Sequence, residues 1–195
     1  MIRKDIFSLW FKVVAACIPG AVVTLLFDDY IEAHLHTPTV IALALIFYGI
    51  AFILIENWNK TRTPKVGTLA DITYQTAFMI GLFQVLSIIP GTSRSGATII
   101  GGLLIGVSRV AVAEFTFYLA VPVMLGLSLI KVIKFGLSFT GAELITLGIG
   151  TVVAFVVSVI VIRFLMSYIK KHDFKVFGWY RIALGVLVLL VFAIR

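Results

Sequence analysis

The sequence has little charge and almost no cysteine. Of its 195 residues, 13% are Asp, Glu, Lys or Arg, about half the share typical of soluble domains, and 61% are hydrophobic. With a mean hydropathy of +1.14, this composition excludes an ordinary soluble domain and indicates an all-α integral membrane protein. The single cysteine, Cys17, lies in an apolar stretch and has no partner for an intramolecular disulfide or a CxxC motif.

Acidic residues are also scarce, since nine Asp and Glu stand against sixteen Lys and Arg, giving a formal net charge of +7. In a soluble chain this excess would favour a nucleic-acid partner. Here the basic residues occupy short loops beside apolar spans, so we expect no nucleic acid and assign them to topology and to contact with anionic membrane lipids. We also expect no cleaved signal peptide, because the basic start leads directly into a span without a small-residue cleavage site.

Five apolar stretches are long enough to cross a hydrocarbon core of about 30 Å as helices. They cover residues 7–27, 39–55, 111–130, 144–166 and 176–194. Prolines inside the first and third stretches predict kinks. The polar linker 57–75 divides the chain into a two-span part, residues 1–75, and a part holding a short hairpin and three spans, residues 76–195.

The segment 90–98, PGTSRSGAT, separates two apolar stretches that are too short to span a membrane. The stretches 76–89 and 97–107 would be roughly 16–22 Å long as helices. A loop with two glycines and an arginine cannot face lipid, because its backbone groups would be unsatisfied there. We therefore predict a re-entrant helix hairpin over residues 76–107, with this polar loop at its tip.

The connecting loops predict an orientation. Alternation of the spans places the N-terminus, the linker, Arg109 and residues 170–175 on one side, where most lysines and arginines lie. By the positive-inside rule this side is cytoplasmic, so the N-terminus is inside and the C-terminus outside.

The residue types in the loop favour an anion, most naturally a phosphate or diphosphate. Arg94 offers a bidentate guanidinium, and the second half-helix, which we expect to begin just after Ser95, points its positive N-terminal end at the same place. We expect Arg94 and Ser93 to be the catalytic residues. The residues expected to bind the substrate through hydroxyls, an amide or close backbone approach are Gly91, Thr92, Ser95, Gly96, Thr98 and Gln84.

Simpler interpretations stay open for these residues. In a purely structural loop, Arg94 would pair with Glu114, which lies early in the third span. Gln84 would then form a hydrogen bond between helices and would not contact a ligand.

Other polar residues have weaker functional interpretations. His34 and His36, in what we expect to be an outer loop with acidic residues 28, 29 and 32, suggest a metal site, but their spacing is loose and we predict no metal ligands in this chain. Arg163 and Arg181 lie near span ends, where we expect them to extend toward the lipid surface.

Three segments carry a resemblance to the undecaprenyl-diphosphatase family, also called bacitracin-resistance proteins. They are TYQTAFMIGLFQ (73–84), PGTSRSGATI (90–99) and GVSRVAVAEFTFYLAVPVM (106–124). The resemblance implies removal of the terminal phosphate from a C55 polyprenyl diphosphate in the bacterial inner membrane, which recycles the lipid carrier for cell-wall synthesis. It also implies two inverted repeats, each with a re-entrant hairpin, whose loops meet at the site.

One part of the family pattern, E-x-x-x-E-x-x-P-x-S-S-x-G-H, is not found in this chain. When that pattern is aligned on Pro90, its two Glu positions fall on Phe83 and Ser87, and when it is aligned on Gly96 its His falls on Ala97. The family implies a divalent cation, Mg²⁺ or Ca²⁺, but its ligands are absent from these positions.

We therefore expect this hairpin to be the second copy in the repeat. Hydrolysis would then require a first half supplied by another polypeptide or by a homo-oligomer. The alternatives are a non-catalytic polyprenyl-phosphate binding or transport protein and an inactive fragment.

Overall fold

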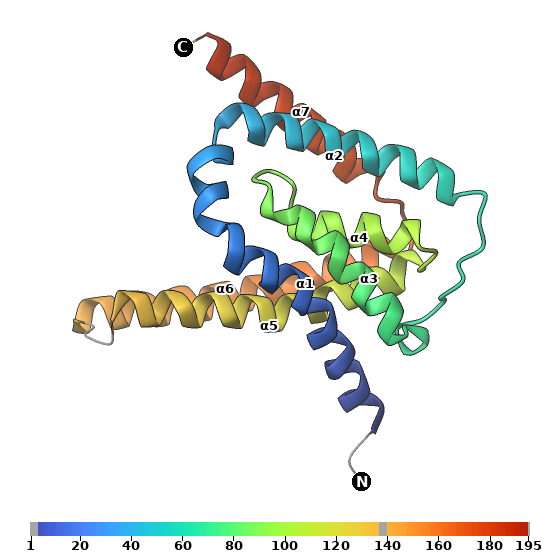
Figure 1. Ribbon diagram of the computed structural model, residues 1–195, viewed down its shortest axis with the longest axis horizontal. Helices are drawn as coiled ribbons and strands as arrows, with labels where there is room; N and C mark the ends of the chain where they lie inside the picture. Colours follow the sequence, from blue (N-terminus) through green and yellow to red (C-terminus); the bar gives the residue numbers. More distant parts are fainter. Residues whose placement is uncertain (1–3, 137–139, 195) are drawn as a thin grey trace.

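The structure is a computed structural model that describes residues 4–136 and 140–194. Over these residues it consists of seven α-helices and two short 3-10 helices, without β-strands (Figure 1). The elements are α1 Lys4–Leu35, α2 Pro38–Asn59, η1 Leu69–Asp71, α3 Tyr74–Val85, η2 Leu86–Ile88, α4 Arg94–Leu104, α5 Arg109–Phe135, α6 Gly141–Ile169 and α7 Lys175–Ala193.

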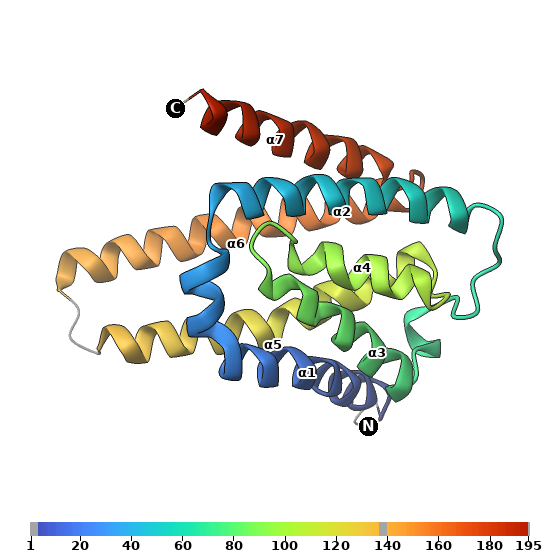
Figure 2. The ribbon, with the colours of Figure 1, turned by 45° about the horizontal axis from the view of Figure 1, so that its top comes forward.

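Five of the described helices, α1, α2, α5, α6 and α7, are long and apolar enough to cross a membrane, which confirms the predicted spans. Pro19 lies inside α1, and this helix bends along its length (Figures 1 and 2). The prediction of an outer loop after the first span is wrong, because residues 28–35 continue α1.

Helices α2 to α6 each begin at a hydroxyl side chain. The side-chain oxygen of the N-cap residue accepts a hydrogen bond from the backbone N–H three residues later; these residues are Thr37, Thr73, Ser93, Ser108 and Thr140. Such caps satisfy backbone donors that have no partner within a helix and that lipid cannot hydrogen-bond.

Helices α3 and α4 form the predicted hairpin at the centre of the molecule (Figure 2). The carbonyl of Gly106 accepts hydrogen bonds from the N–H groups of Lys65 at 2.8 Å and Val66 at 3.1 Å, and the Ser108 N–H donates to Val66 at 2.9 Å. The segment that enters the hairpin and the segment that leaves it therefore lie side by side, as a re-entrant element requires.

The hairpin is enclosed by helices from both parts of the sequence. Helix α1 packs along α3, α4 contacts α5 and α2, and α2 packs along α7. The backbones of α1 and α3 approach closely at Gly81 because glycine has no Cβ. A Cβ at this position would lie only 2.3 Å from the Ala16 carbonyl oxygen. These contacts join residues on both sides of the proposed boundary at residue 75, and that division stays a prediction.

Helix α6 contrasts with this packed centre. Among its residues only Ile169, at the C-terminal end, is buried. The apolar length of α6 therefore faces outward, where hydrocarbon can cover it.

Candidate functional site at the hairpin loop

The loop at the hairpin tip is shorter than the sequence predicted. Helix α4 begins at Arg94, so residues 94–98 form its first turns instead of continuing the loop. The physical reason is the cap at Ser93, whose Oγ accepts the Gly96 N–H at 3.4 Å. Ser93 has a φ of +62°, and no other non-glycine residue in the described ranges has a positive φ, so this side chain sits in strained backbone.

The two loop glycines make room for protein groups. A Cβ at Gly91, which has a φ of +91°, would lie 2.5 Å from the Ile41 carbonyl oxygen on α2. A Cβ at Gly96 would lie 2.9 Å from Nη1 of Arg181 on α7. Both positions thus let neighbouring elements approach the loop backbone, and their predicted contact with substrate stays a prediction.

Arg94 lies partly buried at the start of α4. Its Nη1 atom is buried and has no hydrogen-bond partner. The ion pairs in the described part of the chain join other residues, so the alternative pairing of Arg94 with Glu114 is not formed. A guanidinium in this setting carries a charge that no protein carboxylate balances.

Buried polar atoms without partners occur in the loop and in the helices on either side of it. Across residues 4–136 and 140–194, three buried side-chain polar atoms have no partner: Gln84 Oε1, Thr92 Oγ1 and Arg94 Nη1. All three belong to residues that the sequence placed in the site. Gln84 lies against Gly20 of α1, but its oxygen makes no hydrogen bond between helices. Buried atoms of this kind are normally satisfied by a bound polar group or by water.

Thr98 differs from these three residues, because its hydroxyl is already satisfied inside the protein. Its Oγ1 donates toward the carbonyl oxygens of Arg94 and Ser95 and lies 3.0 Å from Oγ1 of Thr116 on α5. Thr98 is fully buried, and this network ties α4 to α5 beneath the loop.

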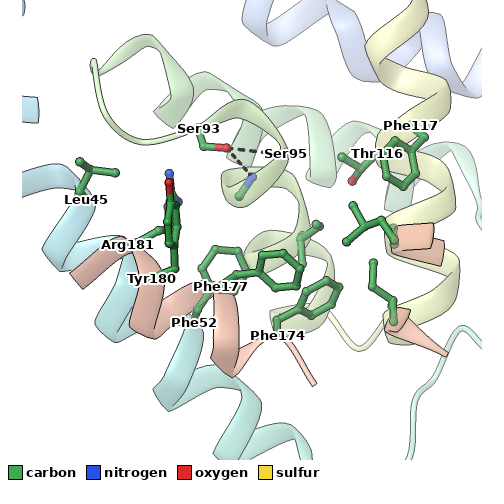
Figure 3. Close-up of a pocket in the computed structure, with 15 residues that line it drawn as sticks. Leu45, Phe52, Ser93, Ser95, Thr116, Phe117, Phe174, Phe177, Tyr180 and Arg181 are labelled. Carbon is green, nitrogen blue, oxygen red and sulfur yellow. Dashed lines mark hydrogen bonds between the residues drawn. The ribbon is translucent and has the colours of Figure 1, made fainter. Parts of the chain in front are cut away.

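A pocket of about 320 Å³ lies beside the loop (Figure 3). Ser93 and Ser95 stand at its wall with their Oγ atoms 3.3 Å apart. Most other walls are apolar, and the aromatic residues among them are Phe52, Phe117, Phe174, Phe177 and Tyr180. A mainly apolar pocket with a few hydroxyls and one guanidinium suits an amphipathic ligand. Arg94 does not line this pocket.

The guanidinium at this wall belongs to Arg181, a residue of the candidate site that sequence reasoning missed. From α7, its Nη1 and Nη2 each donate to the Thr92 carbonyl at 3.1 Å, and Nη2 also donates to the Gly91 carbonyl at 3.1 Å. The expectation that Arg181 extends toward lipid is therefore wrong, because the loop carbonyls attract it inward. The feature of the sequence that could have identified Arg181 is its position inside an apolar span, where an arginine is costly.

The residues around the loop do not suit a divalent cation. Mg²⁺ and Ca²⁺ prefer carboxylate and carbonyl oxygens, whereas Arg94 and Arg181 place two positive charges here and the loop carbonyls already accept hydrogen bonds. No group of three or more His, Cys, Asp or Glu in the described part of the chain is arranged to hold an ion.

The outer histidine site is not assembled by the residues that the structure describes. His34 stacks on Tyr30 with ring centroids 4.4 Å apart and has Nδ1 2.9 Å from its carbonyl oxygen. The side chains of the acidic residues at 28, 29 and 32, the other members of that hypothetical site, are not among those that the structure describes.

Comparison with known proteins agrees with these features. The family model for bacitracin resistance protein BacA matches residues 1–187. A relative named undecaprenyl-diphosphatase from Enterococcus faecalis is 72% identical over 100% of this chain and 70% of its own length. Relatives of the same name from Lachnoclostridium phytofermentans and Desulfitobacterium hafniense are 63% and 58% identical over 96% and 100% of this chain, and over 68% and 70% of their own lengths. The chain belongs to the bacitracin resistance protein BacA family.

Proposed function

We propose that this multi-pass membrane protein acts as an undecaprenyl-diphosphatase, with the hairpin loop binding the diphosphate. The observation that carries the proposal is the pair of unpartnered buried donors, the Thr92 hydroxyl and Nη1 of Arg94. An anionic phosphate would accept from the Arg94 guanidinium and the Thr92 hydroxyl and would balance the Arg94 charge. The family membership and the relatives' names agree with this chemistry.

The proposed roles follow from where each group lies. Arg94 binds the phosphate and stabilises the negative charge that develops on it in the transition state. Ser93 and Ser95 orient phosphate oxygens at the wall of the aromatic pocket, which holds the first part of the prenyl chain. Gly91, Gly96 and Thr98 keep the loop in shape around them.

Hydrolysis transfers the terminal phosphoryl group to water, and the bridging oxygen stays on undecaprenyl phosphate. The attacking water must lose a proton, but no His, Asp or Glu is among the residues that line the pocket. Ser93 therefore lacks an activating base among its described neighbours and orients the phosphate without attacking it. We propose that the proton acceptor and any divalent cation are held by groups of another polypeptide that completes the site.

The distribution of basic residues supports an orientation in the bacterial inner membrane. Lys60, Arg62, Arg109, Lys170 and Lys171 line one pocket at the ends of spans. The positive-inside rule then places this end in the cytoplasm, with the N-terminus inside and the C-terminus outside.

The test is binding of farnesyl diphosphate to the purified chain, measured together with phosphate release in Mg²⁺ or Ca²⁺. We expect Arg94→Ala to weaken binding roughly 10- to 100-fold, the range for losing one charge-assisted interaction. Arg163→Ala, which removes an exposed arginine of α6, is the matched control and should bind as the parent does. Equal affinity of the parent and Arg94→Ala would contradict the proposal.

A second candidate, a polyprenyl-phosphate binding or transport protein without catalysis, is favoured by the absence of an acid or base at the pocket wall. Like the hydrolase proposal, it predicts binding that depends on Arg94, but it predicts no phosphate release even when a polypeptide that supplies the proton acceptor is added. Turnover that Arg94→Ala abolishes would instead select the hydrolase.

A further inference from the structure

A second pocket, of about 540 Å³, lies where several membrane spans end. Its walls come from the end of α2 and the linker after it, the start of α5, and the connection between α6 and α7. Five of its lining residues are Lys or Arg, and Asp173 is the one carboxylate among the lining residues. Of its lining residues it shares only Ile169 with the pocket beside the hairpin loop.

A buried carboxylate joins elements that form the walls of this basic pocket. Glu56 is fully buried, and its oxygens accept from Arg109 Nε at 2.8 and 3.0 Å and from the Phe174 backbone N–H at 3.2 Å. These bonds join α2, α5 and the segment before α7. The charge of Arg109 is therefore balanced by Glu56.

The remaining positive charges of the pocket are largely free. Lys60 faces Asp173 at 3.9 Å, but the two side chains are 55% and 27% exposed, so this pair is weak. Lys170 and Lys171 make no ion pair with a described carboxylate, and Arg62 lies over the Trp58 ring with its guanidinium carbon 3.6 Å from the centroid. The unbalanced charge favours an anionic ligand.

The position of the pocket selects the kind of anion. It lies at the ends of α2 and α6 and the beginning of α5, three helices that can cross a membrane, and therefore at the level of lipid headgroups. Trp58 has the amphipathic ring that is enriched at this level. Basic pockets between transmembrane helices at this depth are known to suit phosphate headgroups.

We propose that this pocket binds the phosphate of an anionic phospholipid, separately from the substrate site at the hairpin loop. Lys170, Lys171 and Arg62 contact the phosphate oxygens, and the lipid tails run along the outward-facing apolar surface of α6. The lipid is thereby held against the connection that leads into α7, the helix that carries Arg181.

The experiment is native mass spectrometry of the full chain in detergent, titrated with dioleoyl phosphatidylglycerol and, in parallel, with dioleoyl phosphatidylcholine. We expect the chain to retain phosphatidylglycerol at lower concentration than phosphatidylcholine. The double variant Lys170→Gln/Lys171→Gln should weaken phosphatidylglycerol binding roughly 30-fold. The matched control, Lys131→Gln/Lys134→Gln, removes the same charge near the C-terminal end of α5 and should change binding less than twofold.

Three outcomes would overturn the proposal. Equal loss in both double variants would show general electrostatic attraction. Equal binding of the two lipids would show that the net negative charge of the headgroup is not recognised. Displacement of phosphatidylglycerol by millimolar inorganic phosphate would show a site for free phosphate. Farnesyl diphosphate binding should be unchanged in Lys170→Gln/Lys171→Gln, so failure here is distinguishable from failure of the proposed function.

Discussion

Replacing Arg181 with alanine removes three hydrogen bonds that hold the backbone of the hairpin loop. They run from its two terminal nitrogens to the carbonyl oxygens of Gly91 and Thr92, each at 3.1 Å. Thr92 is fully buried, so its carbonyl would have no ready access to water in the variant. The loop also contains the strained backbone of Ser93, which persists only while its surroundings hold it.

The size of the effect follows from these contacts. Hydrogen bonds from a charged donor contribute about 1.5–3 kcal/mol each, but three bonds from one side chain do not add fully. We therefore expect a loss of about 3 kcal/mol, which corresponds to a decrease in melting temperature of roughly 6–12 °C for a chain of this size. Arg181→Lys should show an intermediate loss, because one ammonium cannot match the planar fork of the guanidinium at two carbonyls.

The assay combines thermal unfolding in detergent with farnesyl diphosphate binding. If Arg181 positions the loop, Arg181→Ala weakens binding even at temperatures where it is fully folded, and added guanidinium ion partly restores that binding. A purely stabilising residue would lower the melting temperature without changing affinity below it. A melting temperature within 1 °C of the parent, as expected for Arg163→Ala, would refute the reasoning.

Three further changes test other parts of the structure. Glu56→Gln should destabilise the protein by about 3 kcal/mol in thermal unfolding, because it leaves Arg109 without its buried partner, and Glu56→Gln/Arg109→Gln should recover part of that loss. Gly81→Ala should cost about 1–3 kcal/mol by forcing α1 and α3 apart, whereas Gly126→Ala, where nothing lies within 4 Å, should be neutral or stabilising. Ser93→Gly should keep or raise the melting temperature by relieving a positive φ while it weakens farnesyl diphosphate binding, and unchanged affinity would remove Ser93 from the site.

Much of the fold was predictable because hydropathy and length alone constrain a membrane protein. The five spans and the short hairpin follow from how many apolar residues separate polar segments, and the structure places the helices close to those bounds. The start of α4 was placed wrongly, because the cap at Ser93 depends on a local backbone geometry that composition does not reveal.

The loop was also identifiable as a candidate site from its residue types. An arginine among apolar spans, with several hydroxyls beside it, is costly to bury in a membrane and therefore indicates a functional site. Its surroundings were not predictable in this way. Arg181 reaches the loop from 89 residues farther along the chain, and Arg109 meets Glu56 across 53 residues. Neither pairing leaves a periodic or local signal in the sequence.

By itself, the sequence determined that this chain is a membrane protein and where its spans lie, and it predicted a phosphate-like anion at the loop. These conclusions depend on transfer of apolar groups out of water and on local chemistry, which neighbouring residues settle. Only the tertiary structure decided which buried atoms lack partners and that Arg181 donates hydrogen bonds to the backbone of the loop. It also decided that basic residues from three span ends form one pocket. Those features depend on contacts between distant segments, and such contacts exist only once the helices pack.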